Sequence, residues 1–256
     1  MIIINCEQGS QEWHNSRSGV ITASMFSTAR QKVNGLDEKQ QKYVDAILAG
    51  RSEADARDIA GYKAPPRSET VQRAIEGLPV GEFSEAARNY AFRLAIERIS
   101  GEPLDEGFQT YAMKRGHELE PAARLEHEVQ TGLVVERAGF VLTEDRIFGA
   151  SADGLIGNDG GSEYKCLISP EVLRDVLIDH DFTKFIDQVQ GCLWLTGRRW
   201  WDFCLYCPAL ESIGKQLWYR RVERDDAYIE KMVQELWAFE RLVTDNEIAL
   251  RMKEAA

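Results

Sequence analysis

Apolar residues recur at three- and four-residue intervals through the first half of the chain, a spacing typical of helices that bury one face. Tyr43, Ile47 and Leu48 follow this spacing. The helices predicted in this way cover residues 37–49, 84–99 and 111–130. Gly132 is a typical C-terminal stop for the last of them. We therefore expect residues 1–110 to be mainly helical.

After Gly132 the pattern changes to β-branched and aromatic runs bounded by turn residues, which predicts strands. The expected strands are residues 133–143, 148–156, 162–168, 200–207 and 216–222. The expected helices between and after them are residues 170–178, 183–195 and 225–252. Residues 157–161 read Gly-Asn-Asp-Gly-Gly, which is typical of a hairpin turn. The order predicts an α/β fold with a mixed central sheet flanked by helices.

The length of 256 residues suits one large domain, and 44% hydrophobic with 29% charged residues is typical of a soluble globular protein. We expect a single domain over residues 1–256, with a helical elaboration at 1–110, a core at 111–224 and a closing helix at 225–256. No apolar run approaches the roughly 20 residues that cross a bilayer. Residues 1–7 are too short for an export signal and read as an opening strand. We therefore expect no membrane association and a cytoplasmic location.

The net charge of −11 argues against a protein that coats nucleic acid non-specifically. It does not exclude a nuclease, because a metal site needs clustered carboxylates and a DNA path needs only local cations. The five cysteines are odd in number, which argues against a disulfide framework. Cys204 and Cys207 resemble half of a zinc knuckle, but no second pair of Cys or His follows at suitable spacing.

In the most informative segment, nine residues separate Asp153 from Glu163-Tyr164-Lys165. On adjacent antiparallel strands Asp153 and Glu163 can point to one place, and Lys165 shares the face of Glu163. Carboxylate oxygens suit Mg²⁺ or Mn²⁺, and the Tyr164 carbonyl is a candidate further ligand. Lys165 is then placed to orient or deprotonate a water, or to stabilise developing negative charge.

Acid-x-Lys on a strand is common, and by itself it is more typical of a surface ion pair. Three further segments add to it. Glu120 lies on the helix before the sheet, where it is a candidate metal ligand or part of a solvated face. Gln188 and Gln190 lie on the helix after the sheet. Near the start, Arg17 precedes a helix start that Thr22 or Ser24 opens, an arrangement suited to binding phosphate.

These segments together resemble one family, the exonuclease of phage lambda and the YqaJ-like viral recombinases, within the PD-(D/E)xK nuclease superfamily. The matching phrases are Trp-His-x-x-Arg-x-Gly-x-Ile-Thr-Ala-Ser at 13–24, Gly-x-x-x-Glu at 116–120, Ser-x-Asp-Gly-Leu at 151–155, Glu-x-Lys-Cys at 163–166 and Gln-Val-Gln at 188–190. The resemblance extends over residues 8–207, with a poor fit in 34–110.

The resemblance implies a restriction-endonuclease-like core in which Lys165 is the catalytic lysine. The metal ligands it implies are Asp153, Glu163 and, close by, Glu120. The 5′-phosphate pocket it implies comprises Arg17, Ser24, Ser151 and Gln190, with Gln188 matching the other glutamine of that motif. It also implies a ring-shaped homotrimer that digests one strand of duplex DNA from its 5′ end, and a partner single-strand annealing protein in a bacterial or phage-infected cell.

Alternatives remain open from the residues. One is a structure-specific or restriction-like endonuclease, and another is a recombination scaffold that binds DNA without cutting it. A third, a nuclease module of a helicase complex, would need another chain for unwinding, because this one has no Gly-x-x-x-x-Gly-Lys-Ser/Thr loop. The candidates for splitting the duplex are Arg30, Lys32 and Arg67. Residues 198–201, Arg-Arg-Trp-Trp, read as the start of a core strand in preference to a DNA contact.

Overall fold

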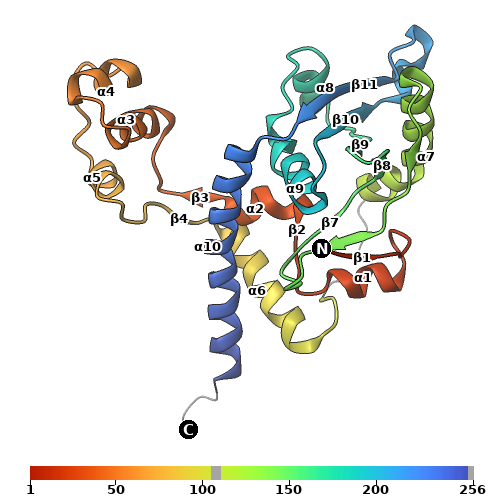
Figure 1. The fold of residues 1–256 in the computed structure, drawn as a ribbon, viewed down its shortest axis with the longest axis horizontal. Helices are drawn as coiled ribbons and strands as arrows, with labels where there is room; N and C mark the ends of the chain where they lie inside the picture. Colours follow the sequence, from red (N-terminus) through yellow and green to blue (C-terminus); the bar gives the residue numbers. More distant parts are fainter. Residues whose placement is uncertain (105–110, 253–256) are drawn as a thin grey trace. The chain divides into compact units, whose positions relative to one another are not determined.

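The computed structural model describes residues 1–104 and 111–252. Contacts divide the chain into two compact units (Figure 1). The larger unit comprises Met1–Arg30 and the residues from Asn89 onward, and the smaller unit is Gln31–Arg88. Of the helical elaboration expected at residues 1–110, only residues 31–88 therefore form a unit of their own.

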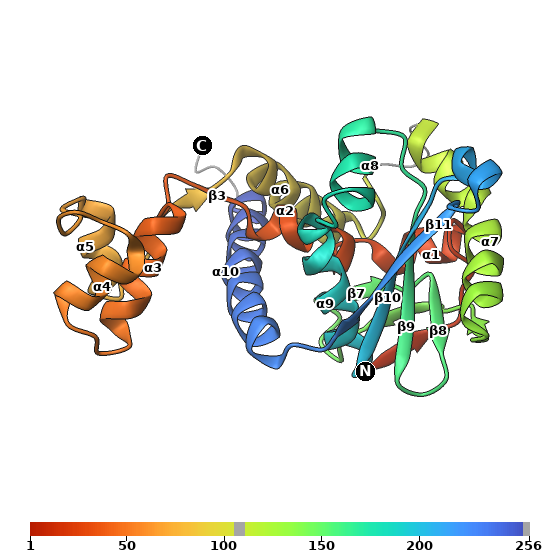
Figure 2. The same cartoon turned by 90° about the horizontal axis from the view of Figure 1, so that it is seen from above.

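A five-stranded mixed sheet forms the centre of the larger unit, and Figure 2 shows its strands side by side. Its order is β11 (Leu217–Glu223), β10 (Trp200–Tyr206), β9 (Gly160–Lys165), β8 (Gly154–Ile156) and β5 (Val135–Glu136). The β9–β10 pair is parallel, and the other pairs are antiparallel. The mixed sheet predicted from the sequence is confirmed, and so is the hairpin at residues 157–161, which joins β8 to β9.

A second sheet of the larger unit has four strands in the order β1 (Ile2–Ile4), β6 (Phe140–Leu142), β7 (Phe148–Ser151) and β2 (Ile21–Thr22). Two predicted strands are therefore wrong as continuous elements. Residues 133–143 divide into β5 and β6, and residues 148–156 divide into β7 and β8, with the halves in different sheets. At the first break a Cβ on Gly139 would lie 2.0 Å from the Ile4 carbonyl oxygen, so the chain passes β1 where only glycine fits.

Helices pack on both faces of the five-stranded sheet. From α7 (Tyr111–Thr131), Ala123 packs with Tyr164 and Cys204 of the sheet. The helix α9 (Ile186–Thr196) contacts β10 and also β6 and β7 of the second sheet. The remaining helices of this unit are α1 (Gln11–Arg17), η1 (Ala23–Met25), α2 (Phe26–Arg30), α6 (Glu85–Ser100), α8 (Pro170–Leu177), η2 (Thr183–Phe185), η3 (Pro208–Ile213) and α10 (Asp226–Arg251).

The Arg-Arg-Trp-Trp segment begins a core strand, as its sequence predicts. Trp201 is fully buried, and Trp200 lies under the Arg221 guanidinium at 3.5 Å from the ring centre. Both indoles pack where the neighbouring strand carries glycine, since a Cβ on Gly160 or Gly161 would meet Trp200 or Trp201 at 2.1 and 2.3 Å. The two tryptophans therefore hold β10 against β9.

The smaller unit has a hydrophobic core of its own. Its helices are α3 (Glu38–Leu48), α4 (Glu53–Ala60) and α5 (Glu69–Ile75), and its strands are β3 (Lys32–Val33) and β4 (Glu82–Phe83). Tyr43, Val44 and Val71 are among its buried core residues. A capping box at Asp37 and Gln40 begins α3, in agreement with the helix predicted at 37–49. The short helices α4 and α5 lack a long apolar repeat and were not predicted individually.

Within the part of the chain that the structure describes, no helix combines the length and the apolar character that crossing a membrane requires.

Candidate active site

The hairpin of β8 and β9 brings the two predicted carboxylates together. Gly154 pairs with Ser162, so Asp153, which immediately precedes β8, lies beside Glu163. The Tyr164 backbone N–H donates to Asp153 Oδ2 at 2.8 Å and fixes that carboxylate against β9. Asp153 therefore occupies the bend between β7 and β8, where the chain passes from one sheet to the other.

Side chains alternate along β9, so one face of the strand packs against α7 and the other carries the charged residues of the site. Tyr164 points toward α7, and its hydroxyl lies 3.0 Å from His127 Nδ1. Glu163 and Lys165 point the other way, toward Gln188 of α9. Lys165 Nζ donates to Glu163 Oε1 at 2.8 Å and to Gln188 Oε1 at 2.9 Å. Gln188 Nε2 donates to Glu163 Oε1 at 2.6 Å, which closes a triangle of hydrogen bonds.

The carboxylates of this site are held in an environment that disfavours their charge. Burial raises the pKa of Glu163 to about 7, and repulsion from Asp153 adds to the effect, while Lys165 opposes it. Burial and repulsion from Glu120 raise the pKa of Asp153 to about 6. Glu163 is 3% exposed, and its Oε2 has no hydrogen-bond partner within the described residues. Such a site is suited to a cation that neutralises both carboxylates.

Lys165 is a charged group in this arrangement. Burial lowers its pKa, but attraction by Glu163 and Asp153 and the hydrogen bond to Glu163 outweigh burial, so the pKa lies above the usual lysine value. A lysine that holds its proton this firmly is suited to stabilising negative charge rather than to accepting a proton. Of the roles that the sequence left open for Lys165, the geometry therefore favours stabilising negative charge over deprotonating a water.

Glu120 lies at the edge of the site and is paired with a cation of its own helix. Arg124 Nη2 donates to Glu120 Oε1 at 2.5 Å and to the Asp153 carbonyl oxygen at 3.1 Å. Burial raises the pKa of Glu120, the Arg124 charge opposes this, and Glu163 adds to it. Arg124 thus holds Glu120 beside Asp153 while neutralising part of its charge. Sequence reasoning missed Arg124, although its spacing of four residues from Glu120 is a recognisable signal.

The donor set fits a hard divalent cation. Asp153 and Glu163 supply carboxylate oxygens, and the unpartnered Glu163 Oε2 is free to coordinate. No group of three His, Cys, Asp or Glu side chains in the described residues is arranged as a complete metal cage. Mg²⁺ requires no such cage, because it keeps several waters and binds through one or two carboxylates. The Tyr164 residue, whose carbonyl is a candidate ligand, lines the same cavity.

A partly buried arginine forms the second part of the site. Arg17 Nη1 donates to Ser151 Oγ at 3.2 Å, and its guanidinium lies 4.1 Å from the centre of the Trp13 ring. Trp13 Nε1 also donates to Ser151 Oγ, at 2.7 Å. Burial lowers the pKa of Arg17 to about 10. No carboxylate among the described residues forms an ion pair with Arg17, so this cation is suited to an anionic ligand.

The helix α1 positions this arginine. Ser10 caps it by accepting from the Trp13 N–H, and Trp13 and Arg17 are four residues apart on one face. Ser24 lies in η1, where its hydroxyl is 3.3 Å from Thr22 Oγ1. Sequence reasoning gave Trp13 no role, although its spacing from Arg17 predicts their contact.

One cavity of about 540 Å³ contains both parts of the site. The predicted residues that line it are Arg17, Ser24, Glu120, Ser151, Asp153, Glu163, Tyr164, Lys165 and Gln188. Segments far apart in the sequence therefore converge on one space, with the arginine pocket at one side and the carboxylates at the other.

The structure corrects the assignment of Gln190 to the phosphate pocket. Its Nε2 donates to the Glu223 carbonyl oxygen at 2.9 Å, and its Oε1 accepts from the Asp225 N–H at 3.1 Å. Two residues along a helix correspond to roughly 200° of rotation, so Gln188 and Gln190 face opposite ways. Gln188 faces the cavity, and Gln190 holds the connection between β11 and α10.

The structure also separates the three candidates for splitting a duplex. Arg30 is mostly buried and ion-paired with Asp187 and Glu235, so it is engaged within the larger unit. Lys32 and Arg67 are exposed residues of the smaller unit. Arg30 is therefore held in ion pairs with the protein, whereas Lys32 and Arg67 are exposed.

Comparisons with known proteins agree with this geometry. Residues 78–199 match the YqaJ-like viral recombinase domain, a range that includes Asp153, Glu163, Lys165 and Gln188. The match begins inside the region 34–110 that fits the family's motifs poorly, and it leaves Arg17 outside. No curated protein matches the chain in sequence.

Solved structures resemble the chain over nearly its whole length. The alkaline exonuclease LHK-Exo from Laribacter hongkongensis is 26% identical, with a TM-score of 0.66 over 94% of this chain and 97% of that one. LHK-Exo in complex with dAMP gives 25% identity and a TM-score of 0.68, over 94% and 96%. A phage-related exonuclease from Haemophilus somnus 129PT, 14% identical with a TM-score of 0.52 over 88% and 99%, shares the fold. The family that the sequence motifs predict is therefore the one whose domain model matches residues 78–199 of this chain.

Proposed function

We propose that the protein is a Mg²⁺-dependent exonuclease that digests one strand of linear double-stranded DNA in the 5′-to-3′ direction. The observation that carries this proposal is the single cavity that Arg17 lines together with Asp153, Glu163 and Lys165. Arg17 is partly buried there and forms no ion pair with a carboxylate of the described residues. A pocket for a terminal phosphate next to a phosphodiester-cleaving centre restricts cutting to strand ends. The likeness to LHK-Exo, described as an alkaline exonuclease, supports the same reaction.

In this mechanism Arg17 and Ser151 bind the 5′-terminal phosphate, with Ser24 at the same pocket. Asp153 and Glu163 hold Mg²⁺ or Mn²⁺, with the Tyr164 carbonyl as a further ligand. The metal, when bound, supplies Lewis-acid stabilisation of the scissile phosphate and lowers the pKa of the attacking water. Lys165 stabilises the negative charge that develops on the phosphate, and Gln188 holds Lys165 and Glu163 in position.

The cellular role we propose is the production of 3′ overhangs for recombination of the phage type. A single-strand annealing protein is the expected partner, and the cytoplasm of a bacterial or phage-infected cell is the expected location. A homotrimeric ring is the expected assembly. Such a ring reconciles a net charge of −11 with DNA binding, because it can place cations along an inner channel.

The test is digestion of a linear duplex with one 5′-phosphate and one 5′-hydroxyl end, beside a closed circle, in Mg²⁺ and in chelator. We expect metal-dependent loss of the phosphorylated strand from its 5′ end while the circle stays intact. Cutting of the circle would establish an endonuclease instead. Absence of cleavage with any divalent metal would indicate a DNA-binding scaffold and overturn the proposed active site.

Arg17→Ala tests the phosphate pocket separately from the cleavage centre. The variant should lose preference for phosphorylated over hydroxyl ends by roughly tenfold or more, since a buried charge-assisted contact to the terminal phosphate is removed. Initial rates on the two ends of the same duplex measure this preference. Equal loss of rate on both ends would show that Arg17 supports the fold rather than the phosphate.

A further inference from the structure

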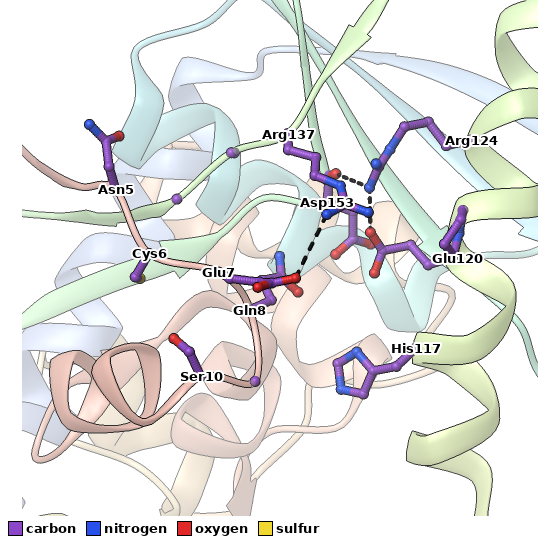
Figure 3. Close-up of a pocket in the computed structure, with 14 residues that line it drawn as sticks. Asn5, Cys6, Glu7, Gln8, Ser10, His117, Glu120, Arg124, Arg137 and Asp153 are labelled. Atoms are coloured by element: carbon purple, nitrogen blue, oxygen red, sulfur yellow. Dashed lines mark hydrogen bonds and ion pairs between the residues drawn. The ribbon is translucent and has the colours of Figure 1, made fainter.

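A second cavity of about 730 Å³ adjoins the active site in the larger unit (Figure 3). It is lined by residues 5–10 between β1 and α1, by one face of α7 and by the turn between β5 and β6. The residues that carry charge there are Glu7, Glu120, Arg124, Arg137 and Asp153. Of these five residues, only Asp153 has a role in the mechanism proposed above.

The two cavities are continuous across the carboxylates. Gln8, His117, Glu120 and Asp153 line both of them. Arg17, Ser151 and Lys165 line only the first cavity. The second cavity therefore meets the first at Asp153 and Glu120, and the residues of the phosphate pocket lie outside it.

The two arginines of the second cavity differ in how strongly they are engaged. Arg124 is mostly buried and already donates to Glu120 and to the Asp153 carbonyl oxygen. The Arg137 side chain is 67% exposed, and its Nη1 lies 3.9 Å from Glu7 Oε1, beyond direct hydrogen-bond distance. The charge of Arg137 also lowers the pKa of Glu120, so its guanidinium lies near that carboxylate. Figure 3 shows Arg137 beside Asp153 and Glu120. Arg137 is thus the more available cation for an incoming anion.

The direction of the DNA strand indicates what binds in this cavity. With the 5′-phosphate at Arg17 and the scissile phosphate at Asp153 and Glu163, the strand must continue beyond Asp153. We propose that the second cavity binds the strand immediately 3′ of the scissile phosphate, and that Arg137 contacts one of the next phosphates. This inference rests on the proposed exonuclease function and adds a binding site on the other side of the cut.

Glu7 is the counterion of Arg137 when no strand is bound. The Glu7 side chain is 80% exposed, so it can turn into solvent when a phosphate replaces it. Glu7→Gln removes this competitor and the local repulsion of phosphate. Its effect on DNA binding should therefore be opposite in sign to that of Arg137→Ala.

The test couples a protein change to a substrate change. A 5′-phosphorylated duplex is made with a single neutral methylphosphonate at the second, third or fourth linkage. Release of the first nucleotide is then measured under single-turnover conditions in Mg²⁺. Arg137→Ala should slow release from the all-phosphate duplex by roughly fivefold, the loss of one charge-assisted contact. At one linkage the methylphosphonate should slow the wild-type protein but leave Arg137→Ala unaffected.

The matched control is Arg174→Ala. The Arg174 side chain is 75% exposed, it lies 3.6 Å from Asp179, and it lines neither cavity. This variant should keep the wild-type rate and the wild-type response to every methylphosphonate. A second readout is the salt dependence of duplex binding in Ca²⁺, where Arg137→Ala should reduce the slope of log affinity against log salt by about one.

The outcomes separate this inference from the function it rests on. If wild-type protein releases nucleotides but Arg137→Ala behaves as Arg174→Ala does, the strand site is wrong and the exonuclease stands. If Arg137→Ala is slower but is coupled to no linkage, Arg137 does not contact a downstream phosphate and the inference is also wrong. If wild-type protein releases no nucleotide, the proposed function and this inference are both overturned.

Discussion

At the scale of single residues, the metal-free fold disfavours the ionised form of Glu163. Its carboxylate is buried beside Asp153, one of its oxygens has no hydrogen-bond partner among the described residues, and its pKa is raised to about 7. Ionising this group at neutral pH therefore reduces the stability of the metal-free fold. A cation between the two carboxylates reverses that effect, which links metal binding to pH.

Glu163→Gln should stabilise the metal-free protein at alkaline pH. Because the folded pKa is raised, the wild-type protein keeps the stability of the neutral acid below the unfolded value near 4.5 and loses it as pH rises through about 7. Gln stands in for the neutral acid at every pH. The gain should be near zero at pH 4 and on the order of 2 kcal/mol at pH 8. Denaturant unfolding in chelator at both pH values measures it.

The same variant should lose the stabilisation that Mg²⁺ gives. Thermal unfolding of wild-type protein should shift upward on adding Mg²⁺ at pH 8 and much less at pH 5.5, since protons compete for the carboxylates. Glu211→Gln, at an exposed position of η3, is the control and should change neither property. A Glu163→Gln protein that still responds to Mg²⁺ would exclude Glu163 as a ligand.

Gln188 and Gln190 make a matched pair of amides with different roles. Gln188→Ala should cut turnover by roughly tenfold or more with little change in stability, because Lys165 and Glu163 lose the group that holds them. Gln190→Ala should cost about 1 kcal/mol of unfolding free energy, because two part-buried backbone groups lose their hydrogen-bond partner. Turnover per folded molecule, measured beside unfolding, distinguishes them. The opposite pattern would restore Gln190 to the pocket.

How far the sequence predicts this site depends on the kind of spacing involved. Asp153, Glu163 and Lys165 follow from strand alternation and a recognisable turn, which are local properties. Which of the two glutamines faces the cavity depends on the rotation of α9 about its axis. The apolar pattern does not fix that rotation, because buried residues adjoin both glutamines. Arg137 was missed because only the folded chain brings the turn between β5 and β6 into one cavity with Glu120 and Asp153.

At the scale of elements, the strands show where local pattern fails. Residues 148–156 carry one continuous strand-like pattern, yet β7 and β8 belong to different sheets. Both halves are buried enough to look alike in sequence, so the boundary at Ala152 and Asp153 is set by tertiary pairing. The helices 37–49, 111–130 and 225–252 were predicted within a few residues because each has many turns of repeating pattern.

The position of α9 is set by a network of charges at its start. Arg30 of α2 pairs with Asp187 and, at 2.6 Å, with Glu235 of α10. Tyr228 Oη donates to the same Asp187 carboxylate at 2.5 Å. Asp187 directly precedes Gln188, so this network connects the segment after Ser24 with the amide that contacts Lys165.

Arg30→Met should destabilise the protein by about 3 kcal/mol, because it leaves mostly buried carboxylates without their partner. The double variant Arg30→Met with Asp187→Asn should recover part of that loss, since the unpaired charge is removed as well. Urea unfolding of the two single variants and the double variant completes the cycle. The control is Arg57→Met, whose ion pair with Asp58 is more exposed and should contribute less than about 1 kcal/mol. Additive losses would show that Arg30 and Asp187 are not coupled.

At the scale of the whole molecule, the smaller unit is built to fold around its own core. Tyr43, Val44 and Val71 pack among its three helices, and its two ends meet where the Ser84 N–H donates to the Gln31 carbonyl oxygen at 2.9 Å. A unit whose ends lie together interrupts the rest of the chain little. The sequence predicted helices here and a poor fit to the family over residues 34–110, but not the bounds 31–88 of a separate unit. Contacts between short helices leave no repeat in the pattern that would mark those bounds.

Replacing residues 33–82 with Asn-Gly should leave a folded larger unit. Lys32 and Phe83 are paired across β3 and β4, so a two-residue turn can join them without moving either end. The shortened protein should keep one cooperative thermal transition and Mg²⁺-dependent release of nucleotides, since every residue that lines the active-site cavity remains. As an independent check in the full chain, Val71→Asp should unfold the smaller unit alone, because it buries an unpaired charge in that core. Loss of cooperative unfolding in both variants would show that the larger unit depends on the smaller one. A folded but inactive shortened protein would assign residues 33–82 to substrate binding.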